Sequence, residues 1–348
     1  GIGVGTAIHP AGRTAFDGLV LIKPDGKLYI HSGAGNLGTF SYAATSRTAA
    51  EVLGMPWERC EIVFGNTGKN VPWNSPQVGS NTCFTLTRTN YVAAMDAKKK
   101  LQEIAAKALN GSPDDFDVGN GRVFLKSDSS RGLTFAEAAE RAIKLGGKYS
   151  GQELPKDLNP ITARAAAALA GQGLVGVAKD NLPIKGLPSA FCAAFVQVEV
   201  DLETGHVEIK ECLGVVDCGT VIHPKSLATQ IMGGGVQGIG FALAEKHVFD
   251  SKFGLAATKG LYTAKPPTYL DVPLDMQWDA VNKPDPHNPI GAKGIGEPPL
   301  GATAAAVLCA VSDALGGIYF NRTPVTCDMI LNAAEKKPQS FKPLEVNV

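Results

Sequence analysis

A single carboxylate stands out in the stretch Gly294-Ile295-Gly296-Glu297-Pro298-Pro299-Leu300, because it lies between two glycines and two prolines. Proline disfavours the helical conformation for the residue before it, so we expect Glu297 to be held extended at the entrance of a helix. Apolar surroundings favour proton uptake by a carboxylate, which suits a general base near neutral pH. A glutamate is also typical of a helix N-terminus, where its charge complements the helix dipole. The stretch alone leaves both interpretations open.

A glycine-rich turn, Gly33-Ala34-Gly35-Asn36-Leu37-Gly38, follows an expected strand and precedes an expected helix, as in dinucleotide-binding folds. Its glycines would let the backbone approach a phosphate, and the helix N-terminus would offer N–H groups. However, no acidic residue ends the next strand, and antiparallel hairpins are expected in place of βαβ units. A nicotinamide-dependent dehydrogenase that uses residues 33–38 is therefore an alternative, as is a plain turn.

Two further stretches could hold a polar ligand. Ser75-Pro76-Gln77-Val78-Gly79-Ser80-Asn81-Thr82 is a run of hydroxyl and amide groups without apolar periodicity, which predicts a loop. Gly233-Gly234-Gly235-Val236-Gln237-Gly238-Ile239-Gly240 is costly as a helix, which indicates a backbone or a bulky cofactor packed against it. Gln230 and Gln237 are two turns apart, so both amides could face one ligand or simply solvent.

The composition excludes several classes of protein. Lys plus Arg and Asp plus Glu number 33 each, so nothing predicts binding to nucleic acid or to an acidic membrane. The seven cysteines form no C-x-x-C pair, which argues against zinc ribbons and iron–sulfur clusters in this chain and indicates a reducing compartment, the cytoplasm. No apolar stretch is long enough to span a membrane. The chain begins at Gly1 without an initiator methionine or a leader, which indicates a trimmed product.

The expected elements define an α+β fold. Strands are predicted at residues 19–22, 28–31, 61–64, 195–201 and 206–216, and helices at residues 41–53, 89–109, 227–243 and 302–315. Twice, a hairpin leads into a glycine turn and a helix, which predicts two similar halves of mixed or antiparallel sheet with packed helices. We place these halves at residues 1–145 and 189–335, joined by residues 146–188, with a tail at residues 336–348.

Taken in order, these stretches resemble the second molybdenum-cofactor-binding domain of the xanthine oxidase / aldehyde oxidase family, the C-terminal half of its molybdopterin-binding subunit. The similarity runs through residues 32–39, 74–82, 216–224, 230–240 and 291–299. It covers about residues 1–335 and is thin between residues 110 and 185.

The resemblance implies a role for each stretch. The glutamate at the position of Glu297 deprotonates a molybdenum-bound hydroxyl, which then attacks an electron-poor carbon while hydride passes to a sulfido ligand. The pterin holds the metal through its dithiolene, so no protein ligand to molybdenum is expected. The residues that the resemblance places at the cofactor are Gly33, Ala34, Gly35, Gly79, Ser80, Asn81, Thr82, Gln230, Gln237 and Gly296.

The resemblance also implies cofactors and partners. We expect molybdenum-molybdopterin, as such or as the cytosine dinucleotide, and an aldehyde or N-heteroaromatic substrate. A partner chain would carry the first half of the molybdenum subunit, and an iron–sulfur subunit with a 2Fe-2S centre and a flavin subunit with FAD would carry electrons away. No nucleic acid and no membrane span are expected.

Two departures from the family pattern affect cofactor contacts. Ala34 stands where the family usually has glutamine, with an apparent extra residue nearby, and His223-Pro224 stands where Asn-Pro is common. The loss of an amide at residue 34 leaves a second alternative, a non-catalytic scaffold homologue. Retention of Glu297 argues against that alternative.

Overall fold

The computed structural model describes residues 1–250 and 252–339, which form two compact units. The first unit contains Gly1–His9, Ser189–Lys283 and the described residues from Ile295 onward. The second unit contains Pro10–Pro188 and Pro284–Gly294. Each unit therefore combines segments that are far apart in the sequence.

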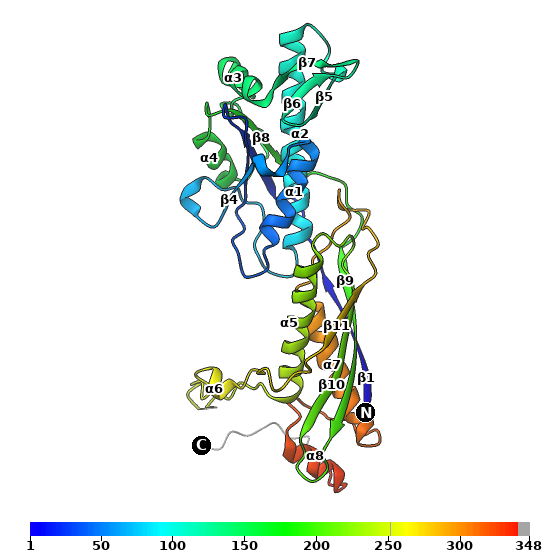
Figure 1. The fold of residues 1–348 in the computed structure, drawn as a ribbon. Coiled ribbons are helices and arrows are strands. Elements are labelled where there is room, and N and C mark those ends of the chain that lie inside the picture. The colour runs from blue at the N-terminus through cyan, green and yellow to red at the C-terminus, as the bar shows by residue number, and fades with distance from the viewer. Residues whose placement is uncertain (251, 340–348) are drawn as a thin grey trace. The chain divides into compact units, whose positions relative to one another are not determined.

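A four-stranded sheet forms the centre of the second unit, with the order β4-β3-β2-β8 (Figure 1). β2 (Asp17–Ile22) pairs antiparallel with β3 (Leu28–His31) and with β8 (Leu174–Lys179). β3 also pairs parallel with β4 (Cys60–Val63). The parallel pair corrects our expectation that antiparallel hairpins replace βαβ units, because a helix crosses between β3 and β4.

Helices cover both faces of this sheet. Val20 of β2 packs in a core that also contains buried residues of α1 (Ser41–Leu53) and α2 (Thr82–Leu109). Leu19 of the same strand packs in a second cluster with α4 (Pro160–Ala168). Alternate side chains of a strand point to opposite faces, so β2 is buried on both.

The region that the sequence left least defined forms a small sheet and a helix. β5 (Phe116–Gly119), β6 (Arg122–Leu125) and β7 (Asp128–Thr134) form an antiparallel sheet in that order. α3 (Phe135–Leu145) follows and is started by a capping box between Thr134 and Glu137. Three single-turn helices complete the unit: η1 (Trp57–Arg59), η2 (Thr67–Lys69) and η3 (Pro113–Asp115).

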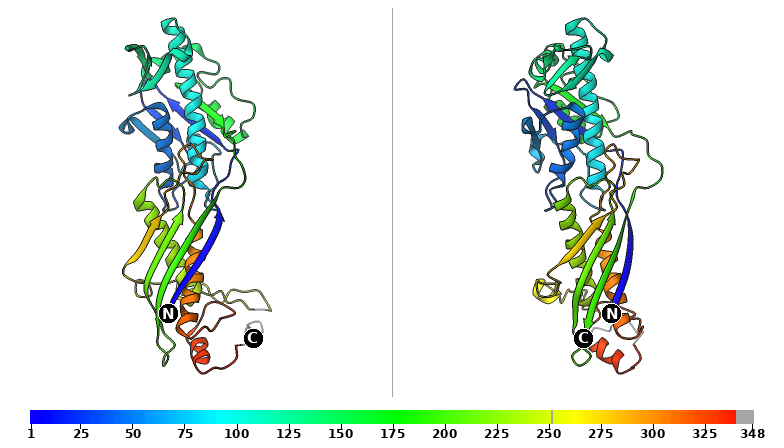
Figure 2. Two further views of the ribbon diagram at one scale, coloured as in Figure 1. Left: turned by 90° about the vertical axis from the view of Figure 1, so that its right-hand side faces the viewer. Right: turned by 45° about the vertical axis from the view of Figure 1, so that its right-hand side comes forward.

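The first unit is built on a second four-stranded sheet, with the order β1-β9-β10-β11. β9 (Ser189–Val200) and β10 (Val207–Asp217) form an antiparallel hairpin. β10 pairs parallel with β11 (Met276–Ala280), and β1 (Ile2–Pro10) lies along the other side of β9 (Figure 2). The N-terminal strand therefore belongs to a sheet whose other strands come almost 200 residues later.

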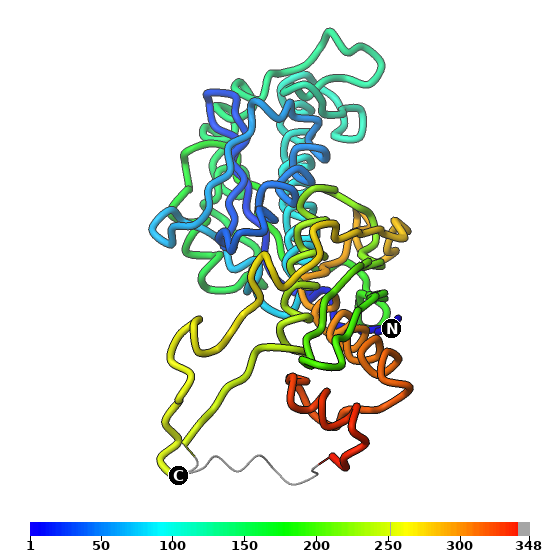
Figure 3. The backbone as a smooth tube through the Cα atoms, turned by 60° about the horizontal axis from the view of Figure 1, so that its bottom comes forward, coloured from blue at the N-terminus to red at the C-terminus, as the bar shows by residue number. Residues whose placement is uncertain are grey.

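Two long helices, α5 (Pro224–Leu243) and α7 (Pro298–Ala314), pack against each other and lie on one face of this sheet (Figure 2). Between α5 and β11, residues 244–250 and 252–275 form a long connection that includes the short α6 (Leu261–Ala264) (Figure 3). α8 (Cys327–Ala334) follows α7. None of the helices in the described ranges is both long and apolar enough to cross a membrane.

The two sheets repeat the same connection. In the second unit, the hairpin β2-β3 leads through α1 to the parallel strand β4 and then to α2. In the first unit, the hairpin β9-β10 leads through α5 to the parallel strand β11 and then to α7. The predicted α+β fold with two similar halves is confirmed.

Most predicted elements exist, but three of them begin at least four residues earlier than predicted. α2 begins at Thr82 rather than residue 89. Its first turns are rich in threonine, which has a low helix propensity, so the sequence did not predict them as helix. In the structure such threonines bond to helix carbonyls, as Thr87 Oγ1 does to Cys83 O at 2.8 Å. α7 begins at Pro298 rather than residue 302, since proline is well suited to a first turn. β9 begins at Ser189 rather than residue 195.

The compact units differ from continuous halves of the sequence. Residues 146–188, which we expected to join the halves, lie in the second unit and contain α4 and the sheet strand β8. Residues 1–9 lie in the first unit, because β1 pairs with β9. Residues 340–348 of the predicted tail lie outside the described residues.

Candidate cofactor and catalytic site

The glycine-rich turn at residues 33–38 lies in the second unit between β3 and α1, and the N–H groups of Gly33, Ala34 and Gly38 donate to neighbouring side chains. The Gly33 N–H donates to Asn74 Oδ1 at 2.9 Å, and the Ala34 N–H donates to Ser32 Oγ at 3.3 Å. A side chain on Gly33 would collide with the Pro72 carbonyl, 2.1 Å from the Cβ position. The absence of a side chain at Gly33 therefore allows two backbone segments to approach each other. It does not make room for a phosphate.

The rest of the turn points to the same conclusion. Ala34 is buried, and the N–H of Gly38 donates to Asn36 Oδ1 at 2.9 Å. Gly35 is half-buried near the Gln77 side chain, with 3.7 Å between its Cβ position and Gln77 Oε1. The turn thus lies against the loop that precedes α2, but its bonded N–H groups weaken the alternative of a nicotinamide-dependent dehydrogenase.

The loop at residues 75–82 is held by its own side chains and ends at α2. Ser75 Oγ donates to Asn81 Oδ1 at 2.6 Å, and Asn81 Nδ2 donates to the Val78 carbonyl. Gly79 and Ser80 both have positive φ, 68° and 51°, so the chain turns sharply just before the helix. Asn81 is fully buried and shapes the loop, which leaves the half-buried Ser80 and Thr82 and the first turn of α2 to meet a ligand.

The segment that leads to Glu297 touches this loop within the second unit. The Gly294 N–H donates to the Ala11 carbonyl at 3.0 Å. A Cβ on Gly294 would lie 1.4 Å from the Ser80 carbonyl oxygen, so only glycine permits this approach. Residues 79–82 and Gly294 are therefore brought together, although they are more than 200 positions apart in the sequence.

A buried cation that the sequence analysis missed anchors the same segment. The Arg88 guanidinium donates to Asp180 Oδ2 at 2.7 Å and to Asp180 Oδ1 at 2.9 Å, and both side chains are almost fully buried. It also donates to the carbonyls of Leu182 and His287. Asn288 Nδ2 donates to Thr87 Oγ1 at 2.7 Å, which ties residues 284–294 to α2 a second time. Arg88 is the only charged residue between positions 70 and 95, and this isolation was the signal in the sequence that could have identified it as a buried cation.

In the first unit, the predicted glutamines lie along one open face of α5. Gln230 is half-buried, Gln237 is exposed, and Gly233 lies between them with nothing within 4 Å of its Cβ position. The opposite face packs on α7, where a Cβ on Gly238 would lie 2.7 Å from the Leu300 carbonyl oxygen. The glycines of α5 predicted a neighbour packed against the helix, and on one face this neighbour is the backbone of α7. On the other face, the amides of Gln230 and Gln237 flank the open position at Gly233.

Glu297 lies at the start of α7 and differs from its prediction in two respects. Its φ of −100° and ψ of −35° are helical rather than extended, because it is the residue from which α7 continues. Both Gly296 and Glu297 are exposed, so the described residues do not form the dry surroundings that we expected around the carboxylate. The carboxylate makes no capping hydrogen bond, and Pro298 and Pro299 have no N–H to cap. Glu297 nevertheless lies at the N-terminus of α7, so the interpretation in which its charge complements the helix dipole stays open beside that of a general base.

In the first unit, the open face of α5 fits a polar organic cofactor. Gly233 leaves space on α5 that a Cβ would occupy, and the amides of Gln230 and Gln237 flank that space with donors and acceptors. In the second unit, Ser80 and Thr82 precede and begin a 28-residue helix whose first N–H groups favour an anionic group such as a phosphate. Among residues 1–250 and 252–339, no group of three or more His, Cys, Asp or Glu side chains could hold a metal ion.

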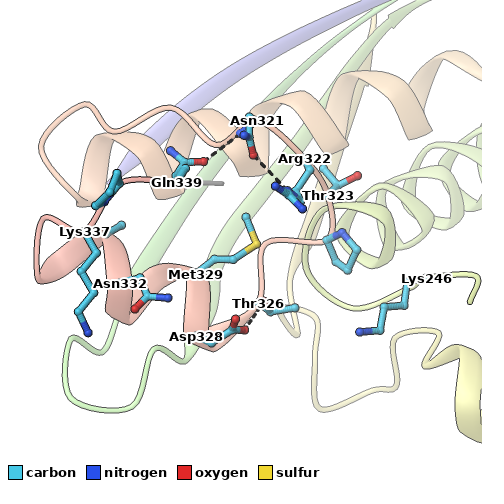
Figure 4. A pocket seen from close by; sticks show the side chains of 13 residues that line it. Lys246, Asn321, Arg322, Thr323, Thr326, Asp328, Met329, Asn332, Lys337 and Gln339 are labelled. Carbon is cyan, nitrogen blue, oxygen red and sulfur yellow. Dashed lines mark hydrogen bonds between the residues drawn. The ribbon is translucent and has the colours of Figure 1, made fainter. Parts of the chain in front are cut away.

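A pocket of about 420 Å³ lies elsewhere in the first unit, beside α8 (Figure 4). Polar side chains from α8 and the loop before it, including Arg322, Asp328 and Asn332, line it, together with Lys246 from the segment that follows α5 (Figure 4). No predicted site residue lines this pocket, so it is not part of the candidate site.

A doubled α+β unit with amide, hydroxyl and carboxyl groups on glycine-rich backbone defines a cofactor-binding protein. The model of the molybdopterin cofactor-binding domain family matches residues 1–273, which is most of the chain. The chain belongs to the molybdopterin cofactor-binding domain family. The resemblance to the xanthine oxidase / aldehyde oxidase family is confirmed.

Relatives of known name are molybdenum-dependent oxidoreductases. The aldehyde oxidoreductase molybdenum-binding subunit PaoC of Escherichia coli K12 is 27% identical over 315 residues, which cover 90% of this chain and 38% of PaoC. The gamma subunit of the 6-hydroxypseudooxynicotine dehydrogenase complex of Paenarthrobacter nicotinovorans is 27% identical over 344 residues, which cover 97% of this chain and 40% of that subunit.

The fold is similar to that of a solved oxidoreductase. The crystal structure of quinoline 2-oxidoreductase from Pseudomonas putida 86 superposes with a TM-score of 0.75 at 24% identity. The superposition covers 97% of this chain and 42% of that chain. This chain therefore spans about two fifths of the length of the relatives that it matches.

Proposed function

We propose that this chain is part of the molybdopterin-binding subunit of a molybdenum hydroxylase, with Glu297 as the general base. The reaction replaces a C–H bond with a C–OH bond at an electron-poor carbon of an aldehyde or an N-heteroaromatic ring. Water supplies the oxygen, and two electrons and two protons are released. When bound, the molybdenum cofactor supplies the two-electron oxidation.

The observation that supports this proposal most directly is the position of Glu297 in a chain of this family. Its carboxylate is exposed at the first turn of α7, where two prolines remove the N–H groups that a capping residue would bond. In the proposed reaction it accepts the proton of the water-derived oxygen nucleophile. The surroundings that exclude water from it are supplied by the remainder of the molybdenum subunit.

The other predicted residues bind and orient the cofactor in this proposal. Ser80, Thr82 and the first turn of α2 hold its phosphate or its cytosine dinucleotide. Gln230 and Gln237 bond its polar edge, with Gly233 leaving room between them. Gly33, Ala34, Gly35, Gly79, Asn81 and Gly296 act through the shape of the backbone, since Gly33 and Asn81 already bond within the second unit.

Electron transfer requires partners in this proposal. A polypeptide that corresponds to the first half of the molybdenum subunit completes the site, an iron–sulfur subunit with a 2Fe-2S centre accepts the electrons, and a flavin subunit with FAD passes them on. None of the seven cysteines is in a disulfide, which is compatible with the cytoplasm that we propose as its location.

Metal and pterin analysis of the complex purified from its native host tests the proposed function. We expect molybdenum and pterin in about equal amounts, measured by mass spectrometry of the metal and by fluorescence of the oxidised pterin. A complex that contains neither contradicts the proposal. Tight binding of NAD by the chain alone would favour the dehydrogenase alternative instead.

A further inference from the structure

The N-terminal strand β1 is inverted relative to an ordinary surface strand, because its glycines face inward and its large apolar residues face outward. Cβ atoms on Gly1, Gly3 and Gly5 would lie 2.1 to 2.2 Å from carbonyl oxygens of α7. The strand backbone thus lies directly on the helix, with no side chains between them. Most of its outward residues are large and apolar: Ile2, Val4 and Ile8 are 65%, 50% and 72% exposed, and Thr6 lies between the last two.

The neighbouring strand β9 continues this apolar surface. Gly1 and Val198 exchange backbone hydrogen bonds of 2.9 Å, and the antiparallel register from this pair sets Val4 opposite Phe195 and Ile8 opposite Phe191. Phe191 and Phe195 are 43% and 42% exposed, whereas the residues between and beyond them on the inner face are buried. We call Val4, Ile8, Phe191 and Phe195, with Ile2 at the rim, the outer apolar face.

This face has a sharp polar boundary on the same strands. Two residues beyond Phe195, β9 presents Gln197 and then Glu199 on the same side of the sheet. Lys210 of β10 forms ion pairs with Glu199 at 3.5 Å and with Glu208 at 3.0 Å. The turn end of the hairpin therefore has the charged side chains of a solvent-facing surface, and at the other end Asp217 of β10, opposite Phe191, borders the apolar residues.

We propose that the outer apolar face binds the remainder of the molybdenum subunit, and this inference rests on the proposed function. A surface patch rich in aromatic and large aliphatic residues is typical of the centre of a protein interface. The chain spans only 38% to 42% of the length of the relatives cited above, so a large polypeptide remains to be accommodated. α5 and α7 already cover the inner face, which leaves the outer face of this sheet for it.

Introduction of a negative charge at one position, with a matched control two residues away, tests the proposal. Phe195→Glu places a carboxylate in the outer apolar face, while Gln197→Glu places it on the same strand and the same side in the polar part. Each variant is expressed in the native host with an affinity tag on this chain, together with the remainder of the subunit. We expect Phe195→Glu to reduce the co-purified remainder at least tenfold and Gln197→Glu to leave it unchanged.

Hydroxyl-radical footprinting of the unsubstituted protein gives a second readout that does not depend on activity. We expect the oxidation of Phe191 and Phe195 to fall several-fold in the complex relative to this chain alone. Val4→Glu repeats the first test if Phe195→Glu lowers the circular dichroism of the folded chain. Footprints that are equal in both states, or complexes of Phe195→Glu and Val4→Glu with normal yield, overturn the proposal.

Two other occupants have distinct outcomes, and each would overturn the proposal. Light scattering of the assembled complex would show a dimer that Phe195→Glu dissociates without loss of the remainder if a second copy covers the face. Sedimentation with phosphatidylcholine–phosphatidylserine vesicles would show binding if a membrane covers it. The proposed function fails separately, through absence of molybdenum and pterin from a complex that still assembles.

Discussion

Two prolines decide how Glu297 can act. A side chain at the N-terminus of a helix is normally used to bond the N–H groups of the first turn, and α7 begins with two residues that lack them. The carboxylate therefore has no capping function to perform, although it stands at the position where one is common. In the proposed function, this carboxylate accepts a proton from the oxygen nucleophile.

Glu297→Gln in the complete complex should lower turnover by about 10²- to 10⁴-fold, the usual contribution of a general base. Molybdenum and pterin content should stay the same, because the substitution keeps size and shape. Glu203→Gln, an exposed glutamate in the turn between β9 and β10, is the matched control and should retain full turnover. Turnover of Glu297→Gln near the unsubstituted value would refute the assignment of the base.

The Arg88–Asp180 pair is a second feature at this scale, and its energetics are those of a buried ion pair. Asp180→Ala would leave the guanidinium buried with only neutral acceptors, and we expect a loss of about 3–5 kcal/mol in the free energy of unfolding. The double variant Arg88→Met/Asp180→Leu should lose less, because it leaves no buried charge. Urea unfolding of the three proteins measures both effects. Equal stability of Asp180→Ala and the unsubstituted chain would contradict this account.

At the scale of elements, the glycines of α5 separate into two functions by the face on which they lie. Gly238 allows the backbones of α5 and α7 to approach closely. A Cβ added to Gly234 would likewise lie 2.7 Å from Pro299 Cβ. Gly233 faces open space on the side of Gln230 and Gln237. The same residue type therefore serves helix packing on one side and, in the proposed function, the cofactor on the other.

Alanine substitutions distinguish these two faces. Gly238→Ala should destabilise the chain by about 1–3 kcal/mol, since the new methyl group would push α5 away from the α7 backbone. Gly233→Ala should stabilise the cofactor-free chain by about 0.5–1 kcal/mol, because alanine loses less conformational entropy in a helix. Thermal unfolding of the two variants in parallel checks the signs. Equal effects would show that the close contact between the helices does not limit stability.

At the scale of the whole molecule, charge balance and exposed apolar surface act together. The chain has 33 basic and 33 acidic residues and a pI of about 7.1, so little net repulsion separates molecules at neutral pH. We expect the isolated chain to associate most strongly near pH 7 at low salt and less at pH 5.5 or pH 9. Light scattering across this range checks the expectation, and association that rises steadily with pH would contradict it.

The local sequence determined most elements and the class of cofactor. Hairpin turns, helix caps and alternation act over a few residues, so β3 and α1 were predicted at their observed bounds. α2 was predicted seven residues short, because its first turns are rich in threonine, which favours other structures in isolation. The family followed from the order of several short motifs, and each of them is read within one stretch of chain.

Tertiary structure alone decided which of these stretches meet and what their glycines do. Gly33 was a candidate for phosphate binding by its motif, but the Pro72 carbonyl and Asn74 occupy its surroundings. The contact of Gly294 with Ser80 and the placement of β1 on α7 depend on close backbone approach between distant segments. No local pattern encodes such an approach, because a glycine looks the same whether its missing side chain makes room for a ligand, a strand or a helix.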